Sequence, residues 1–158
     1  MSMESDLAWH LQHVDLSTQS ATRKAALQTW RQHIGRRVFI GRQATQGGEF
    51  AAVITRVATS RRHGVTRDLP TATALVQVDI LGRRDNAATL TADLGDALRQ
   101  CISHYNGSWN GTGIGAVTTE REGHVPDPPD DASPYWLHRY SLDFLVEFFE
   151  SAVTEGPT

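Results

Sequence analysis

Cysteine and lysine are nearly absent from this chain of 158 residues, which contains one of each. The single thiol, Cys101, can form no disulfide within the chain and cannot belong to a zinc site built from cysteines. It lies on the apolar side of an expected helix, so we interpret it as a buried, inert side chain. The positive charge comes instead from 14 arginines, whose planar guanidinium groups suit protein interfaces. The codon bias of a GC-rich genome explains the same excess and is the preferred explanation.

Long apolar runs and export signals are missing as well. No stretch reaches about 18 consecutive apolar residues, the length of a membrane span. Residues 1–16 lack the basic and apolar parts of a signal peptide. We therefore expect no membrane partner, and assembly in a cytosol. The net charge of −3 argues against a dedicated nucleic-acid-binding protein, because such proteins are usually clearly basic.

Catalytic and cofactor motifs are also lacking. The glycines of residues 111–115, GTGIG, come after an expected helix and before an expected strand, which is the reverse of a dinucleotide-binding loop. His10 and His13 could share one helical face, but no third ligand stands at a suitable spacing. We interpret both histidines as solvent-exposed, and we expect no catalytic residue, no cofactor and no metal. The chain is therefore not predicted to be an enzyme.

Hydrophobic periodicity divides the chain into helices and strands. Apolar residues at helical spacing indicate helices, and strict apolar–polar alternation indicates strands. The pattern predicts helices over residues 4–14, 19–34 and 87–102, and strands over residues 36–41, 50–60, 74–82, 114–122 and 138–150.

This element order, α-α-β-β-β-α-β-β, indicates an α+β fold with a mostly antiparallel sheet of about five strands and helices packed on one face. Residues 1–150 are expected to form one domain, followed by a frayed tail over residues 151–158. Residues 61–73 are expected to be an exposed arm, and residues 104–115 a Gly/Asn-rich connector. The solvent side of the third helix is expected to carry Thr91, Asp93, Asp96 and Arg99.

Asp79 and Asp143 occupy matching polar positions in two of the expected strands. They could form a carboxylate pair only if those strands adjoin. The preferred interpretation is that they keep the outer face of the sheet hydrated or pair with arginine across strands.

Two segments of opposite charge lie between the expected elements. The basic segment SRRHGVTR, residues 60–67, has no aromatic residue for stacking on bases, so we interpret it as a protein contact. The acidic segment PDPPDD, residues 126–131, lacks the alternating ligands of a calcium loop, so we interpret it as a surface loop. Their charges suit pairing between neighbouring copies. We therefore predict a subunit interface that contains Arg61, Arg62, His63, Arg67, Asp127, Asp130 and Asp131.

Layout and short motifs together carry a resemblance to a known family. Residues 72–102 read ATALVQVDILGRRDNAATLTADLGDALRQCI, and a Gly-rich connector, a strand ending in Glu-Arg-Glu and a Pro/Asp loop come next. Residues 137–149 then read LHRYSLDFLVEFF, and GRRVFIGR and FAAVITRVATSRRH stand upstream. Over about residues 20–150, the chain resembles the tail completion, or head–tail joining, proteins of long-tailed bacteriophages, which are similar to tail terminators.

The resemblance implies a structural protein of a phage, a prophage or a gene-transfer particle. Such proteins form a ring, often a hexamer, that caps the tail tube and joins it to the head connector. The implied partners are copies of the chain itself, the major tail tube protein and the head–tail connector protein, with DNA only as cargo passing through the ring. The implied location is the tail or neck of the virion, and the host cytoplasm during assembly.

Two other classes of protein stay as alternatives. A small cytosolic enzyme or ligand-binding α+β domain would have a deep pocket lined by acids with perturbed pKa values. A nucleic-acid-binding accessory protein would be retained on DNA in a salt-dependent manner.

Overall fold

The computed structural model describes residues 2–41, 49–63, 68–83, 87–125 and 138–150. Serine side chains begin the first two helices: Ser2 accepts from the backbone N–H of Ser5, and Ser20 from that of Arg23. The described elements are α1 (Met3–His13), a 3-10 turn (Leu16–Thr18), α2 (Ala21–His33), β1 (Val38–Ile40), β2 (Phe50–His63), β3 (Asp68–Gly82), α3 (Ala87–Ile102), β4 (Gly107–Trp109), β5 (Thr112–His124) and β6 (His138–Phe149).

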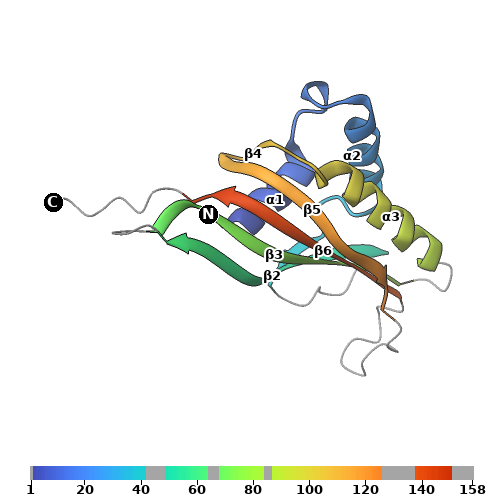
Figure 1. Ribbon diagram of the computed structural model, residues 1–158. Coiled ribbons are helices and arrows are strands. Elements are labelled where there is room, and N and C mark those ends of the chain that lie inside the picture. The colour runs from blue at the N-terminus through green and yellow to red at the C-terminus, as the bar shows by residue number, and fades with distance from the viewer. Residues whose placement is uncertain (1, 42–48, 64–67, 84–86, 126–137, 151–158) are drawn as a thin grey trace.

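The six described strands form one sheet in the order β1-β2-β3-β6-β5-β4. Strands β1 and β2 run parallel, and every other pair of neighbours runs antiparallel. All three helices lie on the same face of this sheet (Figure 1). The α+β class, the mostly antiparallel sheet and the one-sided helical layer agree with the prediction. The expected count of about five strands misses β4, which falls in the expected connector.

Strands β3 and β6 form the centre of the sheet. Residues 71–82 pair with residues 138–149 without interruption, whereas the β2–β3 and β5–β6 ladders each contain two register shifts. The flanking ladders therefore bend and twist more than the centre, because a β-bulge disrupts the ladder locally and increases the twist of its strand.

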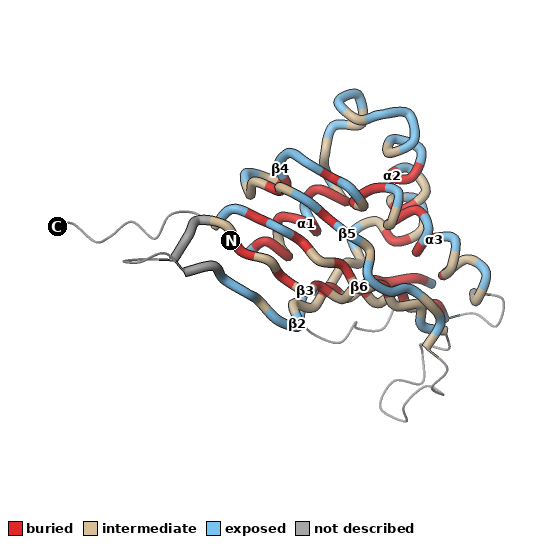
Figure 2. The backbone as a smooth tube through the Cα atoms, in the orientation of Figure 1, coloured by how far each residue is buried: buried red, intermediate tan, exposed pale blue. Residues whose placement is uncertain are grey.

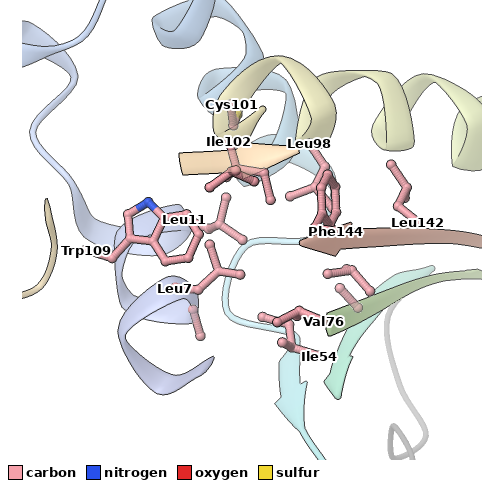
Figure 3. Close-up of a cluster of buried hydrophobic side chains, with 14 of the residues drawn as sticks. Leu7, Leu11, Ile54, Val76, Leu98, Cys101, Ile102, Trp109, Leu142 and Phe144 are labelled. Atoms are coloured by element: carbon pink, nitrogen blue, oxygen red, sulfur yellow. The ribbon is translucent and has the colours of Figure 1, made fainter. Parts of the chain in front are cut away.

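Buried and half-exposed residues alternate along the central strands, as Figure 2 shows by colour. Val76 from β3 and Phe144 from β6 are fully buried on the side that faces the helices. Leu98 of α3 and Leu11 of α1 meet them there, as Figure 3 shows. Removing the ring of such a buried phenylalanine usually costs about 3–5 kcal/mol, so this layer fixes the helices on the sheet.

The β2–β3 hairpin is longer than the sequence predicts. The exposed arm expected over residues 61–73 is wrong for most of its length, because residues 61–63 belong to β2 and residues 68–73 to β3. Arg61 pairs in register with Ala72, and Ser60 pairs with Thr73. The side chains in this part of the hairpin are mostly polar, so no hydrophobic alternation predicts a strand there, although the β2–β3 pairing continues.

Two further expectations about α3 and the connector need correction. Thr91 is fully buried, not solvent-facing, and its hydroxyl donates to the carbonyl of Ala88 at 2.9 Å. In the connector, Trp109 pairs with Thr112 across a two-residue turn. The two turn residues, Asn110 and Gly111, have φ values of 47° and 95°. Asn-Gly is the preferred sequence for such a turn, and this signal would have identified β4.

Candidate interaction surfaces

The described residues contain no group of three or more His, Cys, Asp or Glu side chains that could hold a metal ion. No described helix is long and apolar enough to span a membrane. Cys101 is buried, as expected, and desolvation raises the pKa of its thiol to about 12. A thiol with that pKa stays protonated near neutral pH and is a poor nucleophile.

His10 contradicts the expectation that it is solvent-exposed. Its side chain is 1% exposed and stands edge-on to the ring of Tyr105, with 5.1 Å between ring centroids. Burial lowers the pKa of His10 to about 4, and the nearby charges of Arg31 and Arg23 lower it further in the same direction. Neither ring nitrogen has a hydrogen-bond partner among the described residues. His13, on the other side of α1, is exposed as expected.

Buried carboxylates hold α1 against the sheet. The guanidinium of Arg56 in β2 donates two hydrogen bonds to Glu4, the one from Nη2 at 3.2 Å. Burial alone would raise the pKa of Glu4, but the hydrogen bonds and the charge of Arg56 keep that pKa below its usual value. Asp6 accepts from the amide of Asn110 at 3.2 Å and from the hydroxyl of Thr112. Helix α1 is thus tied to both margins of the sheet, at β2 and at the β4–β5 turn.

Arg31 of α2 holds the other end of α1. Its Nε donates to the carbonyl oxygen of Leu11 at 2.9 Å, and its Nη2 donates to that of Val14 at 2.8 Å. Carbonyl groups at the last turn of a helix have no partner within the helix, and a cation there also interacts favourably with the helix dipole. A single side chain therefore supplies hydrogen bonds to two carbonyl groups at the end of α1 and fixes the angle between α1 and α2.

The face of the sheet opposite the helices is polar at its centre. Asp79 accepts from Gln77 at 2.9 Å and from Ser141, and lies 3.3 Å from the guanidinium of Arg139. Strands β3 and β6 do adjoin, but Asp79 stands opposite Ser141 rather than Asp143. The two carboxylates therefore do not face each other, and the interpretation of cross-strand pairing with arginine is confirmed for Asp79.

Only part of the predicted interface falls within the described residues. Arg61 lies in β2 and donates to the carboxylate of Glu150, just after β6, at 2.7 Å. Arg62 and His63 complete β2, whereas Arg67 and the acidic residues Asp127, Asp130 and Asp131 lie outside the described residues. The acidic segment follows β5, which ends at the far end of the sheet from Arg61.

Both outer strands of the sheet cover only part of their neighbours, a feature that the sequence analysis did not detect. Strand β1 pairs with residues 52–54 of β2, and β4 pairs with residues 112–114 of β5. No described strand pairs with the outer side of residues 55–60 of β2, which we call the β2 open segment, or with that of residues 118–124 of β5, which we call the β5 open segment. Both open segments arise because the outer strands are short: β1 has 3 residues beside the 14 of β2, and β4 has 3 residues beside the 13 of β5.

No protein-family model matches this chain, and no curated protein matches it in sequence. Solved structures do match it in fold. One of them is a chain from the "Virion of native gene transfer agent (GTA) particle", with a TM-score of 0.60 and 10% sequence identity. The likeness covers 94% of this chain and 95% of that chain. Nearly the whole chain therefore shares its α+β architecture with a component of a gene transfer agent particle.

Proposed function

We propose that this protein is a structural virion protein that forms a homo-oligomeric ring, caps the tail tube and joins the tube to the head connector. The observation that carries the proposal is the fold shared with a chain of a gene transfer agent virion over 94% of this chain. The sequence resemblance to tail completion proteins, which concerns the same strands and helix, supports it independently. In this proposal residues 1–150 act as one domain, and the partners are other copies, the tail tube protein and the connector.

The strand ends that flank the two charged segments in the sequence fit a ring better than a contact within one subunit. In the sequence, the basic segment spans the end of β2 and the residues before β3, and the acidic segment stands between β5 and β6. Eleven steps along β3 separate Thr71 from Gly82, which at about 3.3 Å per residue is roughly 36 Å. A closed ring joins one patch of a subunit to a different patch of the next. We propose that the basic and acidic segments belong to two such patches.

The interface is tested by reversing charge at Arg61 and Arg62. The double variant Arg61→Glu, Arg62→Glu should lose the ring in sedimentation velocity and in negative-stain images while keeping its circular dichroism spectrum. Because Arg61 also bonds Glu150 within the subunit, a second variant carries Glu150→Arg in addition and restores that internal pair. Loss of the ring in both variants supports the intersubunit contact. Recovery in the second variant would show that only the internal pair matters.

The function itself is tested in a particle-producing cell. Removing the protein should leave filled heads and finished tails that are not joined, and supplying it from a plasmid should restore joined particles. Electron microscopy of the lysate measures both outcomes. Intact, joined particles in the absence of the protein would refute the proposed role, whatever its oligomeric state.

A further inference from the structure

The backbone of the β2 open segment points toward the outside of the sheet. Ala52 donates to the carbonyl of Arg37 at 2.9 Å, and Ile54 accepts from Gly41, so alternate residues of β2 direct their backbone groups to this margin. Beyond Ile54, no described residue forms a backbone hydrogen bond along this margin up to Ser60. After the register shift between Arg56 and Ala58, the alternation places the N–H of Thr59 on this side.

The opposite margin has the same property. The carbonyl of Val117 accepts from His104 at 2.7 Å, and beyond Val117 no described residue forms a backbone hydrogen bond along the outer side of β5. The β5 open segment follows, and in it Thr119 and Glu122 stand opposite Phe144 and Leu142 at positions whose backbone groups point away from β6. An unpaired strand edge is a template for another strand.

The two open segments have complementary directions and positions. Strand directions alternate from β2 through β3 and β6 to β5, so β5 of one copy placed beside β2 of the next would continue the antiparallel pattern. The open segments overlap but are offset along the strands, because the β2 open segment aligns through β3 with residues 143–147 of β6, whereas the β5 open segment aligns with residues 140–145. Copies joined in this way must be staggered along the strands. A sheet that closes on itself requires such a stagger.

Charge and local twist also differ between the two margins in a complementary way. Arg61 and Arg62 follow the β2 open segment directly, whereas the β5 open segment carries the exposed carboxylates of Glu120 and Glu122. Each open segment contains a register shift, which increases the local twist. Flat strands of unrelated proteins fit such an edge poorly, whereas an edge of matching twist fits it well.

We propose that the β5 open segment of one copy pairs antiparallel with the β2 open segment of the next, so that one hydrogen-bonded sheet runs through the assembly. The partner is a second copy of this chain, and the proposal rests on the homo-oligomeric ring proposed above. It assigns the main contact to backbone edges, to which the charged segments contribute steering and register.

Disulfide trapping tests the pairing directly. Ser60 and Thr118 are both exposed and both lie on the face of the sheet opposite the helices, so cysteines there would meet if the open segments pair. Under mild oxidation, a mixture of the single variants Ser60→Cys and Thr118→Cys should give a covalent dimer, and the double variant a ladder of covalent oligomers. Ala58→Cys and Arg121→Cys, on the same face, give three more combinations and cover a different register.

The controls use the same chemistry at a place where no contact is proposed. The native Cys101 is buried, and Thr73→Cys on the central strand β3 should give no covalent dimer with any partner. A dimer formed by Ser60→Cys alone would mean that two β2 edges pair with each other, which overturns the proposal. Rings without a covalent dimer in any of the four combinations would overturn the edge pairing and leave the proposed ring intact. If the protein forms neither rings nor covalent dimers up to its solubility limit, both the proposed ring and the edge pairing are refuted.

A backbone variant gives an independent measurement. Thr59→Pro removes the N–H that points to the open margin and no bond to β3, and proline is tolerated at such edge positions. The ring should be lost while circular dichroism stays that of the folded chain. A folded Thr59→Pro protein that still forms rings would refute the edge pairing.

Discussion

Protonation of His10 should make the stability of this protein depend steeply on pH between about 4 and 6.5. In the unfolded chain the pKa of His10 has its ordinary value of 6.5, and in the folded protein burial lowers it to about 4. Between these values the unfolded state binds a proton that the folded state does not. The contribution of His10 to the free energy of unfolding is therefore complete above pH 6.5 and is lost as the pH drops toward 4. A difference of this size corresponds to about 3 kcal/mol, at about 1.36 kcal/mol for each pKa unit.

The variant His10→Phe isolates this contribution. Phenylalanine cannot titrate, and it fills a site already lined by the rings of Tyr105 and Trp109. At pH 7 we expect the variant to be at least as stable as the original protein, because two buried nitrogens without partners among the described residues are removed. Urea unfolding at a series of pH values measures the free energy in both proteins. Subtracting one curve from the other cancels every other titrating group.

The matched control is His13→Gln, which changes an exposed histidine of the same helix. This variant should keep the steep pH dependence of the original protein, and His10→Phe should lose about one proton's worth of slope. If the two variants have the same slope between pH 4.5 and pH 6, the explanation from burial of His10 is refuted.

Three further substitutions test local contacts by the change in the free energy of unfolding in urea. Arg31→Met should cost about 2–3 kcal/mol, because the two bonded carbonyls at the end of α1 lose a charged donor; a loss below about 0.5 kcal/mol would contradict the capping role. Gly95→Ala should destabilise the protein by about 1–3 kcal/mol, because the new Cβ would lie 2.3 Å from the ring of Tyr140. In a Tyr140→Ala background the same substitution should stabilise by up to about 1 kcal/mol, because alanine has the higher helix propensity. The same sign in both backgrounds would exclude the clash as the cause. Gly111→Ala should cost about 1–2 kcal/mol because φ is +95° there, whereas Gly123→Ala, with an open environment and no positive φ, should change stability by less than about 0.5 kcal/mol; equal effects would refute the turn argument.

The strongly patterned elements could be predicted from the sequence, and the polar contacts between distant elements could not. Alternation located the central strands and placed Val76 and Phe144 on the buried side. Glu4 and His10 lie on the buried side of α1, where a sequence shows only an interrupted apolar stripe. Burial of Glu4 depends on Arg56, which is 52 positions away, and no local pattern contains that information.

The edges of the sheet were beyond sequence reasoning for a different reason. Hydrophobic alternation reports which face of a strand is buried, but it does not report which strand lies next to it. The ends of β2 and β3 are polar, so the pattern stopped at residue 60 although the hydrogen bonding continues to His63. The open segments appear only when neighbouring strands are aligned, and the interface predicted from charge alone therefore missed them.

The pairing of β3 with β6 has a consequence for synthesis of the chain. His138 meets Gly82 and Phe149 meets Thr71, so a helix and two strands are translated between the partners. While the ribosome makes those residues, the backbone edge of β3 that β6 will pair with has no partner strand. Such non-local pairing slows folding and exposes the nascent chain to aggregation. High-level expression should therefore benefit from slow translation or a chaperone, and a fragment that stops before β6 should precipitate.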